Sequence, residues 1–450
     1  MATDLVSRPF AHPAAKSARS RSRRFASPLT LTSWLLALVL AYFVVYPLLQ
    51  AFLGLFGITS LSGEGGPLDY LLSGETLEAL WNTAVLVACG GTLAIFIGAA
   101  FAWLNERTDA RIGWLAEILP LVSMFVPSLA AAIGWVFLAD PEVGLLNGLL
   151  RSVLGLIGVE LVQGPFNIYS WYGLIWCYTV FLVPFAYLAI SNGLQSLDPS
   201  LEEASRMSGA SPLKTFWRVS LPSLKPALGG AVMLVIVMGI ALYSMPVIIG
   251  TRAGIDVLPV LIVHDVTQSY PVNEISALSR SSILLTIVLI ALYLQRRMVG
   301  YGRAEAFATI GGKGARAGVI RLGRMRRPAK IIMVGYLMAA AVVPLLGLVG
   351  VSLQPFWSAS YNWSALTLDA YRTMFDRPIL REGLLNSLTL ASSCATVAVV
   401  CAVLITHFTE VKGGRIARAI DGVLKTPAAI PHIVFAIALI AAFGGPPGGW

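Results

Sequence analysis

Apolar runs long enough to cross a lipid bilayer recur along this chain of 450 residues. A transmembrane helix needs about 20 consecutive apolar residues, and backbone groups inside a bilayer must find their hydrogen bonds within the protein. Because 57% of the residues are hydrophobic and only 12% are charged, an ordinary soluble domain is excluded. The sequence therefore predicts an all-α fold, a polytopic membrane helical bundle of about nine transmembrane helices. The expected spans are 31–55, 79–104, 114–138, 168–193, 227–250, 279–299, 329–353, 381–406 and 416–443.

Positive charge is concentrated on one side of this predicted bundle. The net charge is +9, and most cations fall before residue 25, between 206 and 225, or between 296 and 330. Alternating spans place these segments together, whereas the segment 56–78 on the other side has carboxylates and no cation. Since cytoplasmic loops are enriched in Lys and Arg, we expect a cytoplasmic N-terminus and no nucleic acid as a partner. A short apolar stretch at 143–158 is expected to lie on the outer side as an interfacial or re-entrant segment.

The chain also contains an internal repeat. Asn82 corresponds to Asn386 at an offset of 386 − 82 = 304, and the match runs without a gap over 80–137. The preceding span repeats at a slightly different offset, because Pro47 corresponds to Pro344 and 344 − 47 = 297. Parallel repeats of this kind are related by an axis along the membrane normal. We therefore expect two tandem halves with a substrate pathway between them.

The repeat predicts four parts of the chain. They are a basic tail (1–30), a first half (31–299) with a polar loop at 198–226, a linker (300–328) and a second half (329–450). A second copy of the polar loop is expected near 203 + 304 = 507, beyond the last residue, Trp450. The interpretation is that the second half is incomplete, truncated at its C-terminus before its own loop.

The polar loop predicts two short helices joined by a tight turn. Its residues 203–222 read EASRMSGASPLKTFWRVSLP. Pro199 and Pro212 each suit the first turn of a helix, and Gly209 suits the left-handed conformation that ends one. Pro222 is expected to stop the second helix. One face of that helix is apolar by i, i+3, i+4 spacing, and it carries Leu213, Phe216 and Trp217.

This loop resembles the coupling loop in permease subunits of bacterial binding-protein-dependent ABC importers. The family pattern is E-A-A, three residues, G, nine residues, I, one residue, L-P. The matching positions here are Glu203, Ala204, Ser205, Gly209, Val219, Leu221 and Pro222. Ser205 and Val219 depart from the pattern conservatively, and the spacing is intact. The alternative interpretation is an ordinary amphipathic cytoplasmic loop.

The resemblance implies that the loop docks into a cleft on cytoplasmic ATP-binding subunits. Glu203 would make a polar contact there, Gly209 would allow the sharp turn, and the apolar face would anchor the loop. The candidate coupling residues are Glu203, Ala204, Ser205, Gly209, Leu213, Phe216, Trp217, Leu221 and Pro222. Tyr243 and Ser244, which precede Pro246, are candidate pathway residues.

Two halves in one chain most resemble the fused ferric-iron type of this family, and residues 313–327 and 243–254 carry that closer resemblance. It implies a permease of the bacterial inner membrane that passes ferric iron from a periplasmic substrate-binding protein, with ATP hydrolysis in a separate subunit. Importers of thiamine, polyamines or phosphonates use related permeases. A non-transporting truncated remnant and a secondary transporter or channel are further alternatives.

The sequence predicts neither an enzyme nor a cofactor or metal site. The stretch 311–314 (GGKG) is no phosphate loop, because Phe307 stands where the first Gly belongs and no Ser or Thr follows the Lys. The histidines are scattered, and carboxylates at metal-ligand spacing are not evident. His264 and Asp265 are expected in a solvated or interfacial outer loop.

Overall fold

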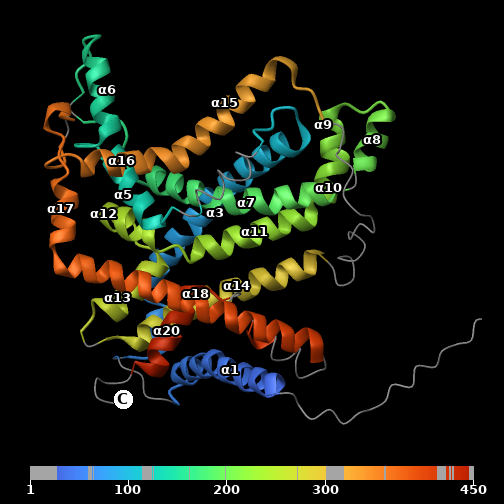
Figure 1. Cartoon of the computed structure of the whole chain (residues 1–450), viewed down its shortest axis with the longest axis vertical. Helices are drawn as coiled ribbons and strands as arrows, with labels where there is room; N and C mark the ends of the chain where they lie inside the picture. The colour runs from blue at the N-terminus through green and yellow to red at the C-terminus, as the bar shows by residue number, and fades with distance from the viewer. Residues whose placement is uncertain are drawn as a thin grey trace, which may run out of the picture.

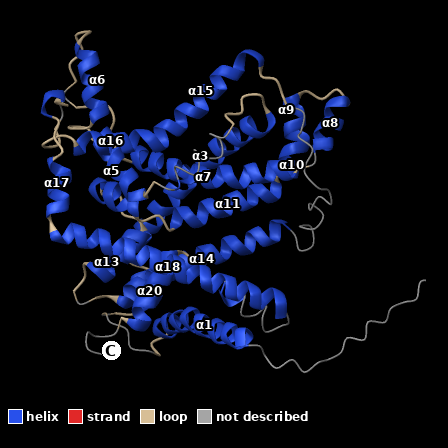
Figure 2. Cartoon of the chain, in the orientation of Figure 1, coloured by secondary structure: helices blue, strands red, loops and turns tan. Residues whose placement is uncertain are grey.

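The computed structural model describes residues 28–444, except 59–62, 64, 114–123, 125, 162, 198, 271, 300–318, 359–360, 413–421, 425–426 and 428–429. These residues form helices and connecting loops (Figure 2), with an isolated bridge between Thr108 and Ile320. The all-α prediction is therefore confirmed for the part of the chain that is described.

The helices up to the predicted linker are α1 (Pro28–Leu55), α2 (Pro67–Leu71), α3 (Gly74–Arg107), α5 (Ser128–Ala139), α6 (Leu145–Gly155), α7 (Trp171–Ser196), α8 (Pro199–Met207), α9 (Pro212–Thr215), η1 (Phe216–Ser220), α10 (Leu221–Ser223), α11 (Lys225–Ile240), η2 (Pro246–Gly250), α12 (Thr251–Ala253), α13 (Leu258–Thr267) and α14 (Glu274–Val299). Those that follow are η4 (Gly323–Met325), α15 (Arg326–Leu337), η5 (Met338–Val342), α16 (Val343–Ser352), η6 (Trp363–Ala365), α17 (Asp369–Asp376), α18 (Pro378–Lys412) and α20 (His432–Phe443).

Six of the described helical segments are long and apolar enough to cross a membrane, and two bent helix pairs raise the number to at most eight. The polytopic architecture agrees with the prediction. The expected count of nine is not reached within the described residues, where the spans at 114–138 and 416–443 are represented only by α5 and α20.

The span expected at 227–250 is not one continuous helix. Helix α11 ends at Ile240, and a new helical segment begins at Pro246 and then bends by 98° between Ala253 and Leu258. Pro246 has no backbone N–H to continue the α11 ladder, and Gly254 takes a left-handed φ of 69° at the bend. The helix is therefore broken close to Pro246, and the chain folds back after it.

Helix α3 lies at the centre of the predicted first half, in contact with α7, α11 and α13 (Figure 1). Its glycines set the spacing to α7. A Cβ at Gly90 would lie 2.7 Å from the Tyr178 Cβ, and a Cβ at Gly98 would lie 2.9 Å from the Tyr187 nitrogen. Close packing of this kind matters because lipid supplies no hydrophobic driving force between apolar helices. Their association therefore depends on van der Waals contact, which small residues allow.

The helix bounds recur at the offsets found in the sequence. The start of α18 is offset from that of α3 by 378 − 74 = 304, and the start of α20 is offset from that of α5 by 432 − 128 = 304. The end of α16 is offset from that of α1 by 352 − 55 = 297. Pro127 and Pro431 precede α5 and α20 with nearly equal backbone angles (φ −55° and −53°, ψ 128° in both). The division into four parts stays a prediction.

The two repeats exchange their first long helices. Helix α1 contacts α20, whereas α16 contacts α5 (Figure 1). Phe443 of α20 lies between Phe43 and Tyr46 of α1, with ring centroids 5.8 and 5.5 Å away. A Cβ on Gly134 of α5 would lie 2.4 Å from the Pro344 carbonyl oxygen of α16. Each repeat is thus held by a helix from the other.

Candidate functional site

The polar loop folds as a bent pair of short helices. Helix α8 ends at Met207, and Gly209 follows with φ +82°. The Ala210 N–H donates to the Ser205 carbonyl at 3.2 Å, which closes the helix end. This φ value confirms the left-handed conformation predicted for Gly209. Glycine suits the position because a residue with a Cβ would be strained there. The segment from Pro199 to Ser223 is hereafter called the coupling segment.

The second helix starts as predicted but does not stop at Pro222. Ser211 caps it, since its Oγ accepts from the Lys214 N–H at 3.3 Å. The helix then widens into the π-helical turn η1, in which the Leu221 N–H donates to the Phe216 carbonyl. Pro222 sits in the first turn of α10, and the chain bends by 61° into α11. The predicted stop is wrong because the wider turn accommodates a residue without an N–H.

Glu202 anchors the coupling segment to the membrane bundle. Its carboxylate lies 3.0 Å from Nε of Arg107, the last residue of α3. Nη2 of Arg107 donates to the Leu194 carbonyl of α7 at 2.7 Å, and the Ser220 Oγ donates to Glu202 at 2.7 Å. Both charged side chains are largely buried. This ion pair ties α8 to α3, α7 and η1.

Sequence reasoning passed over Glu202 in favour of Glu203. A signal was present, because two adjacent carboxylates on a short helix face different directions and Arg107 ends an apolar span. The structure shows the division of roles: Glu202 is turned inward, whereas Glu203 is exposed and makes no ion pair among the described residues.

The other predicted coupling residues lie in the same segment with unequal exposure. Ala204, Gly209 and Pro222 are exposed, and Ser205 and Leu221 are half-buried. The Ser205 Oγ lies 3.1 Å from the Thr215 Oγ1 and joins α8 to α9. The side chain of Leu213 lies outside the described residues.

The predicted apolar face is only partly free. Phe216 packs edge-on against Trp103 of α3, with ring centroids 5.9 Å apart. Trp217 is 60% exposed and contacts Phe216 at 5.7 Å. Phe216 is therefore covered by the end of α3, whereas Trp217 is the aromatic side chain that the segment exposes.

A second segment of the chain borders this site. The Ile320 N–H donates to the Arg107 carbonyl at 2.9 Å, and the Asp109 N–H donates to the Ile320 carbonyl at 3.1 Å. The Leu322 N–H donates to Asp109 Oδ1 at 3.0 Å, and Arg326 Nε lies 3.8 Å from Asp109 Oδ2. Ile320 also lines a small pocket with Glu202, Glu203, Arg206 and Phe216. Nothing in the sequence pattern indicated this contact.

The candidate pathway residues lie elsewhere. Tyr243 and Ser244 occupy the break between α11 and η2, where both are half-buried, and the Tyr243 carbonyl accepts from the Val247 N–H at 3.0 Å. A cavity of about 330 Å³ opens between α3, α11 and α14, and neither residue lines it. Its lining is apolar apart from Thr83 and Thr92. The pathway role of Tyr243 and Ser244 stays a prediction.

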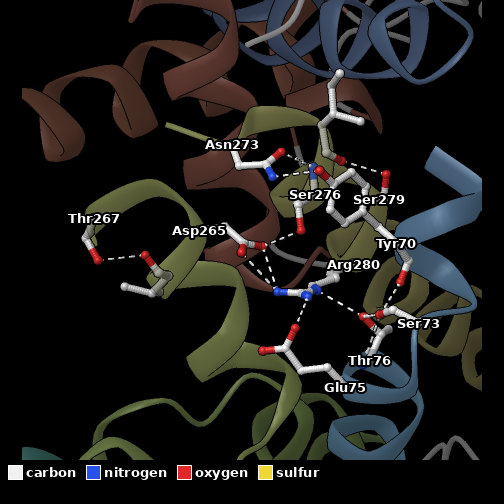
Figure 3. Close-up of polar contacts among 12 residues, drawn as sticks. Tyr70, Ser73, Glu75, Thr76, Asp265, Thr267, Asn273, Ser276, Ser279 and Arg280 are labelled. Carbon is white, nitrogen blue, oxygen red and sulfur yellow. Dashed lines mark hydrogen bonds and ion pairs between the residues drawn. The ribbon is translucent and has the colours of Figure 1, made fainter. Parts of the chain in front are cut away.

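The prediction that Asp265 lies in a solvated or interfacial loop is wrong. It is buried on α13, and Arg280 of α14, also buried, donates to both of its carboxylate oxygens at 3.0 Å. The same guanidinium donates to Glu75 at 2.7 Å and to the Thr76 Oγ1 at 2.9 Å, both on the first turn of α3 (Figure 3). A buried arginine with two carboxylates satisfies the charge that burial would otherwise penalise. Its neighbour His264 is exposed.

The two polar clusters mark opposite ends of α3. The Arg280 cluster holds the first turn at Glu75 and Thr76, and the coupling segment is held at the last residue, Arg107. At 1.5 Å per residue, this helix of 34 residues is about 50 Å long. That length exceeds the roughly 30 Å thickness of a hydrocarbon core, so α3 is long enough to hold the two clusters on opposite sides of a membrane.

The sequence is similar to a family of membrane transport components and to individual permease proteins. Residues 90–299 match the family described as "Binding-protein-dependent transport system inner membrane component". The chain is 23% identical over 414 residues to "Ferric transport system permease protein FbpB" of Actinobacillus pleuropneumoniae, covering 91% of this chain and 58% of that protein. It is 24% identical over 414 residues to "Putative ferric transport system permease protein FbpB 1" of Haemophilus influenzae, covering 91% and 63%. The chain thus spans about three fifths of the length of these relatives.

A solved structure shows weaker likeness. It is the "bacterial alginate ABC transporter in complex with alginate pentasaccharide-bound periplasmic protein", with a TM-score of 0.46 and 17% identity, covering 60% of this chain and 96% of that chain.

Proposed function

Because residues 90–299 match the family of binding-protein-dependent transport system inner membrane components, we propose that the chain is the membrane permease of an ATP-driven importer. The observation that carries the proposal is the coupling segment. It is bent at Gly209, fixed to the bundle through Glu202 and Arg107, and exposed at Glu203 and Trp217. A rigidly anchored and outwardly exposed helix pair suits the transfer of force from another protein.

The proposed partner at this segment is a cytoplasmic ATP-binding subunit, which carries out the ATP hydrolysis. Glu203 offers it an exposed charge that forms no ion pair within the described part of the chain, and Trp217 offers an aromatic anchor of the kind enriched at protein interfaces. Rearrangement of the ATP-binding subunits would displace α8, and the buried ion pair would pass that displacement to the ends of α3 and α7. The chain itself is a transport subunit and no enzyme.

The proposed substrate is ferric iron, handed over by a periplasmic substrate-binding protein. The names of the two ferric relatives support this substrate. The cavity beside α3 offers no carboxylate, His or Tyr among the described residues that line it, and ferric iron prefers hard oxygen ligands. Selection of the metal therefore falls to the binding protein, and the permease supplies a weakly interacting route.

The proposed orientation places the coupling segment and the N-terminus in the bacterial cytoplasm. The coupling segment carries Arg206, Lys214 and Arg218, whereas the first turn of α3 at the other end carries Glu75. An excess of Lys and Arg on the cytoplasmic side is the rule for inner-membrane proteins. The division into two permease halves joined by the linker 300–328 belongs to the same proposal.

The test is a substitution at the bend. Gly209→Arg puts a side chain on a left-handed residue and bulk onto the proposed interface. We expect normal membrane insertion but loss of the ATP hydrolysis that an iron-loaded periplasmic protein stimulates in the assembled complex. Gly254→Arg is the matched control, because Gly254 also has a positive φ and open space around its Cβ but lies in the other bend. Normal stimulation in Gly209→Arg would refute the proposed function.

A further inference from the structure

We propose that the coupling segment drives both repeats through a clasp formed by residues 107–109 and 319–326. The inference rests on the proposed function and deepens it. Residues 319–326 belong to the last part of the predicted linker (300–328), and the chain continues from them along α15 into the second repeat. Three consecutive residues at the end of α3 hold both this segment and α8.

The first contact runs from α8 to Arg107. The Arg107 side chain binds Glu202 at 3.0 Å, while its backbone carbonyl accepts from the Ile320 N–H at 2.9 Å. One residue thus contacts the coupling segment by its side chain and, by its backbone, the segment that leads into the second repeat. Arg107 is 6% exposed, so water does not replace either contact freely.

The middle of the clasp is stiff. Thr108 is fully buried, and its Oγ1 donates to the Leu104 carbonyl and accepts from the Ala110 N–H at 3.1 Å. A side chain bonded on both sides fixes the backbone between Arg107 and Asp109. A displacement of Arg107 therefore moves Asp109 rather than being absorbed between them.

The last contact runs from Asp109 to α15. The Asp109 N–H donates to the Ile320 carbonyl at 3.1 Å, and the Asp109 carboxylate accepts from the Leu322 N–H at 3.0 Å. Arg326, the first residue of α15, lies 3.8 Å from the same carboxylate. Helix α15 continues through η5 into α16, which packs on α5. A single coupling segment is in this way mechanically connected to a membrane-crossing helix of each repeat.

The clasp also extends the proposed docking surface. Val319 is 43% exposed beside Ile320, and Ile320 lines the pocket that Glu202 and Glu203 border. The exit of the predicted linker is therefore part of the surface that an ATP-binding subunit meets, although it lies far from the coupling motif in sequence.

Hydrogen exchange of the full chain in lipid nanodiscs tests the connection without any partner. Glu202→Gln leaves Arg107 without its carboxylate, and the amides of 319–323 should then exchange faster, by on the order of tenfold, although Glu202 bonds none of them. Glu203→Gln is the matched control and should leave those amides unchanged. If Glu202→Gln does not fold, Ser220→Ala removes a single bond to Glu202 and should give a smaller change of the same sign.

Equal hydrogen exchange of 319–323 in the wild type and in whichever of these two variants folds would overturn the clasp and leave the proposed function intact.

A second experiment includes the ATP-binding subunit. Asp109→Ala should keep the association with the ATP-binding subunit yet reduce stimulated ATP hydrolysis, whereas no association even of the wild type would count against the proposed function itself. Full stimulation in Asp109→Ala would contradict the clasp alone.

Discussion

Arg280 Nη1 lies 3.0 Å from both carboxylate oxygens of Asp265, and this ion pair joins α14 to α13 beside the first turn of α3. Both side chains are at most 9% exposed. The Ser276 Oγ of α14 donates to the same carboxylate at 2.8 Å. Arg280 also bonds Glu75 and Thr76 of α3, so three helices meet at its guanidinium. The bend between α12 and α13 is held at its far end by this contact.

Breaking that pair should destabilise the protein. Arg280→Gln leaves Asp265 buried with an uncompensated charge, and removing one partner of a buried pair costs about 3–5 kcal/mol. We expect a clearly lower unfolding temperature in detergent. Arg372→Gln is the control, because Arg372 forms an exposed pair with Asp369, and such pairs contribute about 0–1 kcal/mol. Equal losses in the two variants would contradict the buried role of Arg280.

Substitutions of the two adjacent glutamates should have different effects, one on the stability of the fold and the other on binding of the ATP-binding subunit. Glu202→Ala leaves the buried Arg107 without its carboxylate, and we expect a loss of about 3 kcal/mol in the free energy of unfolding. Glu203→Ala should leave the unfolding temperature unchanged, because Glu203 is exposed, yet weaken binding of the ATP-binding subunit. Thermal unfolding and co-purification measure the two effects. The reverse assignment of effects would show that the roles are exchanged.

The glycines of α3 should tolerate no side chain where α7 passes. A Cβ at Gly98 meets atoms of Ala186 and the backbone nitrogen of Tyr187 at 2.9–3.2 Å. Gly98→Val should therefore cost about 1–3 kcal/mol through overpacking, seen as reduced folded yield. Gly229→Ala on α11 is the control, since nothing lies within 4 Å of its Cβ. A neutral Gly98→Val would mean that α3 and α7 lie farther apart.

Accessibility to a membrane-impermeant thiol reagent tests the orientation. The four free cysteines are first replaced by Ala. Trp217→Cys should then be labelled only from the cytoplasmic side and Glu75→Cys only from the periplasmic side, because the two sites lie at opposite ends of α3. Labelling of both from one side would disprove a crossing by α3, and exchanged sides would reverse the proposed orientation.

Much of the coupling segment was predictable because its instructions are local. A proline in the first turn, a capping Ser211 and a left-handed Gly209 act on their own backbone, so each could be identified without knowledge of its neighbours. Pro222 was misjudged because a π-helical turn, which depends on the residues before it, accommodated the missing N–H.

The sequence by itself determined the helical class, the two repeat offsets and the starts of the short helices, since hydrophobic length, spacing and caps act within a segment. Only the tertiary structure decided which polar groups are buried together. Glu202 meets Arg107 across 95 positions, Asp109 meets Leu322 across 213, and Asp265 meets an Arg280 that was expected in a span. An isolated charge in a helix is chemically the same whether it faces water or a partner, and its burial depends on packing between segments distant in sequence.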